Sequence, residues 1–405
     1  MQCSALSNSN FLKLLSFRLF IVLAYQMMAI VVGWHIYELT HDTLALGLIG
    51  LAEVIPYFSS ALFAGYAVDH YSRRMFGVLS GFMVSLSALT LTAVAMGWIH
   101  GSTLWWLYGA IAFNGVARAF MSPTYSSLFA LIMPREEYAR ASSIGSSVFQ
   151  LGLVVGPALG GLLVGWAGKS ASYGAATFLS LAAAASLLSL RVNEPPPAES
   201  TPIFTSIAGG LRFVFSNQIM LGALSLDMFA VLFGGAVALL PAFIQDVFHY
   251  GPEELGILRA APAIGAVATG LFLARHPINL HAGRWLLGAV AGFGLCIISF
   301  ALSGNIWLAG TLLILSGICD GVSVVMRTTI MQLVTPDEMR GRVSAINGIF
   351  IGSSNELGAL ESGIAARLMG LIPSVIFGGV MTLIVVAGTT KLAPKLRRLE
   401  LHQLY

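Results

Sequence analysis

The sequence predicts an all-α membrane protein of twelve transmembrane helices, arranged as two similar six-helix bundles. Three observations predict this fold: a very apolar composition, a regular series of long apolar runs, and a direct repeat. Apolar residues make up 57% of the 405 residues and charged residues only 10%, against about 25% charged in an average soluble domain. So few charges could not cover the surface of a soluble protein, whereas they suit a surface that faces lipid.

The apolar runs give the spans. About 20 apolar residues cross the hydrocarbon core, and their backbone must satisfy its own hydrogen bonds as a helix. The predicted spans are 17–38, 44–68, 75–98, 104–132, 139–166, 171–191, 218–245, 254–275, 284–302, 306–334, 342–370 and 373–391. A polar, proline-rich stretch interrupts the series after the sixth. The predicted domains are therefore an N-terminal bundle (1–192), a cytoplasmic linker (193–213) and a C-terminal bundle (214–405).

The basic residues orient the predicted spans. With a cytoplasmic N-terminus, only Lys169 and Arg367 fall on the outer side, and Arg118, Arg259 and Arg327 fall within spans. The cytoplasmic segments then hold sixteen of the 21 Lys and Arg, at positions 13, 18, 73, 74, 135, 140, 191, 212, 275, 284, 340, 342, 391, 395, 397 and 398. The positive-inside rule therefore predicts a multi-pass membrane protein with both termini cytoplasmic.

The direct repeat relates the two halves. The segment 134–144, PREEYARASSI, reappears without a gap as 336–346, PDEMRGRVSAI, at an offset of 202 residues. The same offset relates Gly115 to Gly317, Gly156 to Gly358 and Gly161 to Gly363. Chance likeness between apolar helices does not explain matching Pro, Glu, Arg and Ser in a loop. Parallel repeats about an axis along the membrane normal are an architecture of secondary transporters.

Several motifs then resemble one family. The segment 65–74, GYAVDHYSRR, resembles the G-x-x-x-D-R-x-x-R-[RK] loop of the major facilitator superfamily. The segment 152–161, GLVVGPALGG, resembles the G-x-x-x-G-P-x-x-G-G helix of its antiporters. The linker and the segments 210–215 and 335–342 resemble the branch that holds enterobactin exporters and macrolide efflux proteins. The resemblance implies the major facilitator fold and secondary active transport by alternating access, and it implies no enzyme activity.

The resemblance also implies a gate. Asp69, Arg73 and Arg74 occupy the charged positions of the family loop, where a carboxylate pairs with arginines in one state of the transport cycle. The alternative is a basic cluster that only keeps the loop in the cytoplasm. His70 stands where the family usually has Arg, and the corresponding loop of the second half, 274–284, lacks the Asp.

The fifth span carries small residues at close spacing: Gly152, Gly156, Pro157, Gly160 and Gly161. Small residues let helix backbones approach closely, and the proline bends the helix. We expect this face to pack against another helix. Packing alone is as good an account as a specific antiporter function.

Charges within the spans are the sharper functional signal, because a charge near the bilayer centre is costly and needs a cavity or a partner. A proton-driven transporter needs a carboxylate that binds and releases a proton near neutral pH. Three acids are proton-coupling candidates, with Asp227 first because span 7 lines the pathway in this family: Asp227, Glu356 and Glu53. The substrate-cavity candidates are Gln26, Arg118, Asp320, Arg327, Asn355 and Glu361. The alternative for each acid is an ion pair that fixes helices and never titrates.

Arg118 and Asp320 lie at equivalent positions of the repeat and are expected on the inner walls of one cavity. No nucleotide-binding GxxxxGK[ST], HExxH or CxxC pattern occurs, so neither a cofactor nor a metal is expected. The net charge of +3 is too small to indicate a nucleic-acid partner. The expected partners are a small-molecule substrate, protons and the lipid bilayer, for a protein acting as a monomer.

The sequence thus favours proton-driven efflux of a small amphiphilic molecule. A siderophore is the first substrate class and a drug or macrolide the second, because arginines and acids within the spans suit anionic or catechol groups. Two alternatives stay open: an importer of a siderophore or other metabolite on the same fold, and a non-transporting membrane sensor.

Overall fold

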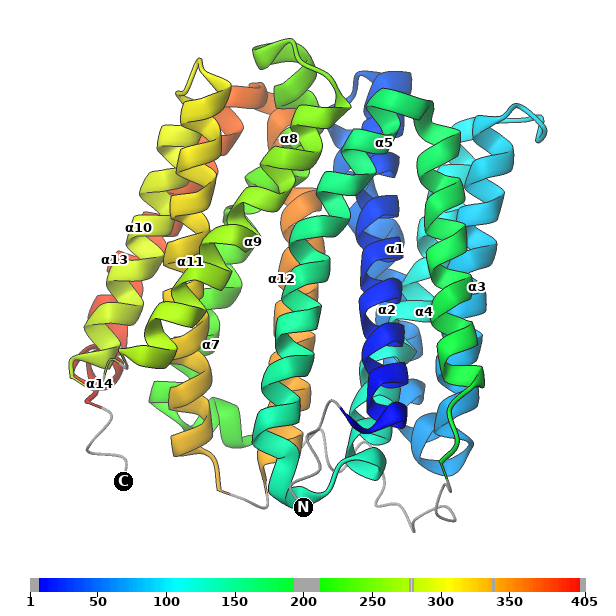
Figure 1. Ribbon diagram of the computed structural model, residues 1–405. Helices are drawn as coiled ribbons and strands as arrows, with labels where there is room; N and C mark the ends of the chain where they lie inside the picture. Colours follow the sequence, from blue (N-terminus) through cyan, green and yellow to red (C-terminus); the bar gives the residue numbers. More distant parts are fainter. Residues whose placement is uncertain (1–6, 193–211, 277, 279, 337–338, 401–405) are drawn as a thin grey trace. The chain divides into compact units, whose positions relative to one another are not determined.

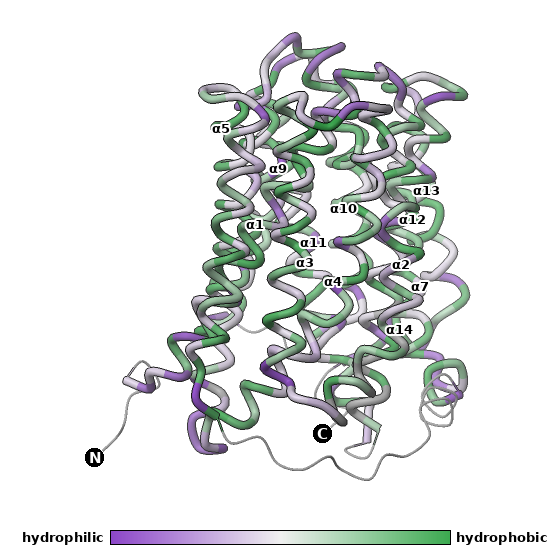
Figure 2. Tube along the Cα trace, turned by 90° about the vertical axis from the view of Figure 1, so that its right-hand side faces the viewer, coloured by the Kyte–Doolittle hydropathy of each residue, from purple (hydrophilic) through white to green (hydrophobic). Residues whose placement is uncertain are grey.

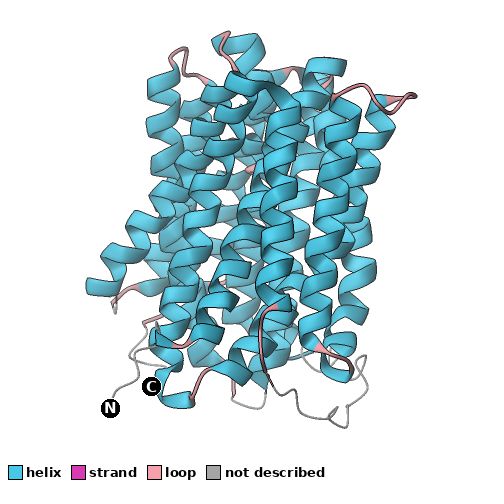
Figure 3. Ribbon diagram, turned by 45° about the vertical axis from the view of Figure 1, so that its right-hand side comes forward, coloured by secondary structure: helices cyan, strands magenta, loops and turns pink. Residues whose placement is uncertain are grey.

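The structure, a computed structural model, describes residues 7–192, 212–276, 278, 280–336 and 339–400. Within these residues it contains helices and no strand (Figure 3). The expected linker lies almost wholly outside them. Apolar residues run along the helices, and hydrophilic residues gather mainly at their ends (Figure 2). The prediction of an all-α membrane protein is therefore confirmed.

The chain divides into two compact units. Unit 1 comprises Met1–His41, Leu51–Glu199 and Tyr250–Ala260, and unit 2 comprises Asp42–Gly50, Ser200–His249 and Ala261–Tyr405. The main helices of unit 1 (Figure 1) are α1 (Ser9–Thr40), α2 (Thr43–His70), α3 (Arg73–Ala95), α4 (Thr103–Ile132) and α5 (Tyr138–Leu188), with a short 3-10 turn η2 (Arg135–Glu137) before α5.

Polar side chains begin several of these helices. The Asn8 side chain accepts hydrogen bonds from the first backbone N–H groups of α1, and Ser72 does the same for α3. Such caps satisfy donors that have no partner inside the helix. Because of this cap, α1 begins eight residues before its predicted membrane span.

The helix α5 holds two spans. Gly168 interrupts it with φ 82° and ψ 171°, a backbone conformation that glycine adopts readily because it has no Cβ. The chain turns there, so the predicted spans 139–166 and 171–191 are the two arms of α5.

Unit 2 contains α7 (Gln218–Phe233), η3 (Gly235–Leu239), α8 (Leu240–Ala242), η4 (Phe243–Phe248), α9 (Pro252–Arg275), α10 (Ala282–Ala301), α11 (Ile306–Val334), α12 (Arg340–Met369), α13 (Leu371–Leu392) and α14 (Pro394–Arg397). The span predicted over 218–245 is present but is not one regular α-helix. After Gly234 it continues as a 3-10 helix, a short α-turn and a π-helix. Two adjacent glycines and Pro241 weaken the regular hydrogen-bond ladder there.

The described residues account for all twelve spans. Nine helical segments are long and apolar enough to cross a membrane, and one of them contains both arms of α5. The remaining two spans are α4 and α12, each 30 residues long. The predicted boundaries agree with the helices to within a few residues, except at the early start of α1.

Two helices begin in one unit and end in the other. The first turns of α2 pack on α12 within unit 2, where a methyl group added to Gly47 would lie 3.0 Å from Cα of Gly363. The first turns of α9 pack on α5 within unit 1, where a methyl group added to Gly161 would lie 2.8 Å from Cα of Gly256. Arg367 also donates to Asp42 at 3.1 Å beside the first crossing. Small residues therefore allow two equivalent close crossings.

Candidate substrate and proton-coupling site

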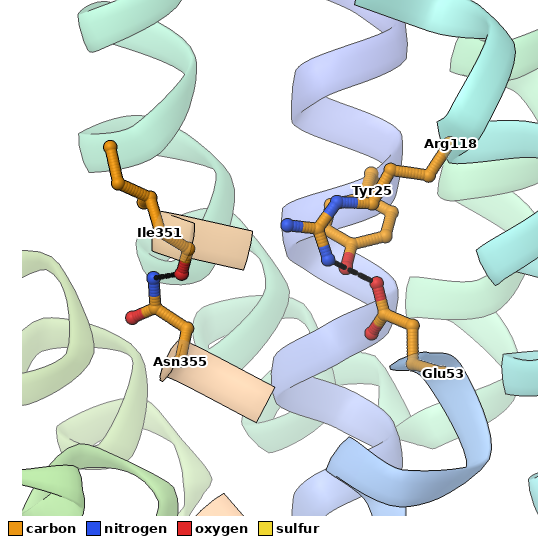
Figure 4. Close-up of polar contacts among 5 residues, drawn as sticks. All are labelled: Tyr25, Glu53, Arg118, Ile351 and Asn355. Carbon is orange, nitrogen blue, oxygen red and sulfur yellow. Dashed lines mark hydrogen bonds and ion pairs between the residues drawn. The ribbon is translucent and has the colours of Figure 1, made fainter. Parts of the chain in front are cut away.

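Three helices of unit 1 bring a carboxylate, a guanidinium and a phenol together (Figure 4). Arg118 of α4 donates through Nη1 to Glu53 Oε1 of α2 at 2.5 Å. The Tyr25 hydroxyl of α1 donates to the same carboxylate oxygen and accepts from Arg118 Nη1 at 3.2 Å. We call Tyr25, Glu53, Tyr57 and Arg118 the Glu53 cluster. It joins one proton-coupling candidate to one substrate-cavity candidate.

Aromatic rings complete the cluster. The Arg118 guanidinium carbon lies 5.2 Å from the ring centre of Tyr57 and 5.5 Å from that of Tyr25. Both distances are within the range of cation–π attraction. Glu53 is only 7% exposed, whereas the Arg118 side chain keeps 30% of its surface accessible. The Arg118 side chain is therefore the more accessible member of this ion pair.

A glycine positions the cluster. Gly115 lies one turn before Arg118, and a methyl group there would be 2.5 Å from the backbone oxygen of Glu53. Only a residue without a side chain lets α4 approach α2 this closely. The match of Gly115 with Gly317 in the repeat was the sequence signal for this contact. In unit 2, Gly317 of α11 packs in the same way on the backbone of Pro262 in α9.

A second ion pair lies in unit 2. Asp227 of α7 pairs with Arg327 Nη1 of α11, and their side chains are only 9% and 3% exposed. The helix α11 thus supplies the cationic partner of Asp227, because the sequence on either side of Asp227 contains no basic residue. Arg327 Nε has no hydrogen-bond partner among the described residues. The pair therefore joins the first proton-coupling candidate to a substrate-cavity candidate, in a more enclosed place than the Glu53 cluster.

The other candidates are more scattered. Asp320 is half-buried in α11 and takes part in no ion pair among the described residues. On α12, Asn355 is exposed and donates to the Ile351 oxygen at 2.9 Å (Figure 4). Glu356 and Glu361 of the same helix are half-buried.

The candidate gate is described only in part. The side chain of Asp69 lies outside the described residues, so its pairing stays a prediction. Arg74 Nη1 donates to the backbone oxygen of Leu190 at 2.9 Å, and Arg73 is half-buried. Arg74 therefore holds the start of α3 to the end of α5.

The glycines of α5 face two partners. Methyl groups added to Gly152, Gly156 and Gly160 would meet Val22, Gln26 and Ile30 of α1 at 2.6–2.7 Å. Gly161 and the Pro157 oxygen instead meet the start of α9. Gln26, expected at the substrate cavity, thus packs its Cβ against Gly156.

The family follows from comparison with known proteins. A family model described as the Major Facilitator Superfamily matches residues 14–359. The chain belongs to the major facilitator superfamily. Curated relatives include the enterobactin exporter EntS of Citrobacter koseri, 27% identical over 382 residues, covering 90% of this chain and 88% of the relative. EntS of Escherichia coli O1:K1 / APEC is 27% identical over 384 residues, covering 90% and 89%.

Solved structures of major facilitator transporters share the fold. A peptide transporter POT in complex with sulfate matches with a TM-score of 0.77 at 12% identity, covering 98% of this chain and 97% of that one. A POT family transporter in complex with 5-aminolevulinic acid matches with a TM-score of 0.74 at 11% identity, covering 95% and 96%. The predicted fold is therefore confirmed, and this superfamily member is a membrane transporter rather than an enzyme.

Proposed function

We propose that this transporter exports a small amphiphilic molecule across the bacterial inner membrane by alternating access, driven by protons. A siderophore with catechol groups is the first substrate class, and a drug or macrolide is the second. We further propose cytoplasmic termini and a functional monomer. The relatives named as enterobactin exporters support the substrate class, although at 27% identity.

The Glu53 cluster is the observation that carries this proposal. It offers a carboxylate that accepts hydrogen bonds, a guanidinium and a phenol that donate them, and two tyrosine rings. A catechol ring can stack on a tyrosine while its two hydroxyls donate to the carboxylate.

The same carboxylate gives a coupling mechanism. Export driven by inward proton flow requires that proton and substrate exclude each other on the protein. Hydroxyl groups of a substrate donate strong, charge-assisted hydrogen bonds to ionised Glu53, whereas a proton on Glu53 weakens this acceptor and adds a competing O–H donor. Proton and catechol therefore compete for one group, as antiport requires.

An anionic substrate would reverse the coupling. An anion that pairs with Arg118 takes the partner of Glu53, and a buried carboxylate without its cation binds a proton more readily. Proton and anion would then bind together, and the inward proton gradient would drive uptake. The accessible Arg118 thus favours import as the second candidate function.

Asp227 is the alternative proton carrier. Its pair with Arg327 has the same chemistry but is nearly closed to ligands. We therefore propose Glu53 as the first site of proton exchange, and we propose that the Asp227–Arg327 pair holds α7 to α11. Both acids are tested separately below.

Transport into inverted membrane vesicles tests the direction and the substrate. Vesicles with an acidic interior should accumulate a catechol siderophore through the wild-type protein, and dissipating the pH gradient should abolish the accumulation. Glu53→Gln should lose gradient-driven uptake. Glu38→Gln, which removes an acid exposed on α1 and paired with Lys169, is the matched control and should retain it. Accumulation only in right-side-out vesicles would instead establish import.

A further inference from the structure

One end of unit 1 contains a basic cavity that shares only Arg74 with the candidate gate and no residue with the Glu53 cluster. Its volume is about 670 Å³, and it is lined by Ser9, Asn10, Lys13, Arg74, Leu188, Ser189, Leu190 and Arg191. We call it the α1/α3/α5 cavity, because it lies among the start of α1, the start of α3 and the end of α5. Three lining residues are cationic and none is acidic.

Hydrogen bonds build the walls of this cavity. Lys13 Nζ donates to the Ser189 oxygen at 2.7 Å, and Asn10 Nδ2 donates to the Arg191 oxygen at 2.9 Å. Arg74 donates in the same way to the Leu190 oxygen. These three hydrogen bonds together hold the backbone carbonyl groups of residues 189–191, which follow the end of α5. These contacts fix the cavity, and they use only one of the three N–H donors of the lysine ammonium. No acid lines the cavity, so the charges of Lys13 and Arg191 can attract a ligand.

The place of the cavity points to a ligand in the membrane. It lies at the ends of three spans, on the side where the positive-inside distribution puts the cytoplasm. One residue beyond Arg74, an exposed apolar stripe runs down α3: Met75, Leu79, Phe82, Leu86 and Leu89, each 47–55% exposed. Leu12 and Leu188 beside the cavity are also exposed, at 42% and 50%. A headgroup in the cavity would therefore have a surface for its acyl chains alongside.

We propose that the α1/α3/α5 cavity binds the phosphate headgroup of an anionic phospholipid from the cytoplasmic leaflet. Basic pockets between spans on the cytoplasmic side are suited to such headgroups. A free phosphate would use the same cations but would gain nothing from the apolar stripe. The inference does not depend on the substrate or direction proposed above.

Native mass spectrometry of the purified full-length protein tests the proposal, with phosphatidylglycerol and phosphatidylcholine as probes. The wild type should retain phosphatidylglycerol in preference. Arg191→Gln should weaken retention about fivefold, and Lys13→Gln with Arg191→Gln about 25-fold, since each cation near the surface contributes a comparable attraction. Arg140→Gln removes an exposed cation at the start of α5, outside the cavity, and should change nothing. Equal retention of both lipids, or equal loss in Arg140→Gln, would overturn the proposal.

Two further experiments test whether something other than a phospholipid occupies the cavity. Millimolar inorganic phosphate should not displace phosphatidylglycerol, and full displacement would make the cavity a site for free phosphate. Glu194 and Glu199 follow closely on Arg191 in the sequence. If phosphatidylglycerol binds well only after Glu194→Gln and Glu199→Gln, the acids of the chain itself occupy the cavity and the lipid proposal fails. Because Arg191 donates no side-chain bond to the walls of the cavity, its variant is expected to fold.

Discussion

Breaking the Asp227–Arg327 pair should destabilise the protein strongly. The side chains are 9% and 3% exposed, so removing one partner leaves a buried charge without compensation. The expected cost for Asp227→Asn is about 3–5 kcal/mol, which is a change of roughly two to three and a half orders of magnitude in the folding equilibrium. Replacing both, with Asp227→Leu and Arg327→Met, removes the charges together and should be close to neutral.

Reversible unfolding in SDS, followed by circular dichroism, measures these free energies. Glu38→Gln is the control, because its ion pair with Lys169 is 2.8 Å long but its side chains are 48% and 27% exposed. Exposed pairs contribute about 0–1 kcal/mol. If Asp227→Asn costs no more than this control, the pair does not hold α7 to α11 and the reasoning from burial is refuted.

The double variant also decides which acid carries the proton. With near wild-type stability it should keep transport driven by a pH gradient, because Glu53 is intact. If the double variant folds normally and only exchanges substrate down its gradient, Asp227 is the carrier and Glu53 is not.

Three further predictions follow from the packing and from the gate. Gly161→Leu should destabilise the α5–α9 crossing by about 1–3 kcal/mol, because a methyl group already meets backbone 2.8 Å away, whereas Gly174→Ala has nothing within 4 Å and should be neutral or stabilising in thermal unfolding. Asp69→Asn should insert at normal levels yet slow initial transport rates strongly, and a wild-type rate would exclude the gate. In a cysteine-free background, Arg118→Cys should react with a hydrophilic thiol reagent and Arg327→Cys should not, since their side chains are 30% and 3% exposed. Equal reactivity would contradict the assigned burial.

The spans were predictable because the membrane imposes one strong requirement, a run of apolar residues long enough to cross it. The end of α11 and the start of α4 therefore match the sequence prediction within a residue. The break after Gly234 was not predicted. The apolar run continues through it, and hydropathy carries no information on backbone geometry. The early start of α1 depends on the Asn8 cap, which lies outside the membrane signal.

The candidate charges were predictable one at a time but their partners were not. A charge in an apolar run is visible in the sequence, whereas the pairing of Glu53 with Arg118 depends on how α2 and α4 are rotated about their axes. The same holds for Asp227 and Arg327, which lie 100 residues apart in the chain. The repeated glycines Gly115 and Gly317 were the one available signal, because they mark where α4 and α11 meet a neighbouring backbone.

Proton release on substrate binding tests the central claim most directly. Purified protein in weakly buffered detergent solution is mixed with a catechol siderophore between pH 5 and 8, and the protons released are counted for the wild type and for Glu53→Gln. Competition at Glu53 predicts that the wild type releases protons as the substrate binds. It also predicts that Glu53→Gln releases none, whether or not the variant still binds the substrate. Proton uptake by the wild type, or an equal release by Glu53→Gln with substrate bound, would contradict it.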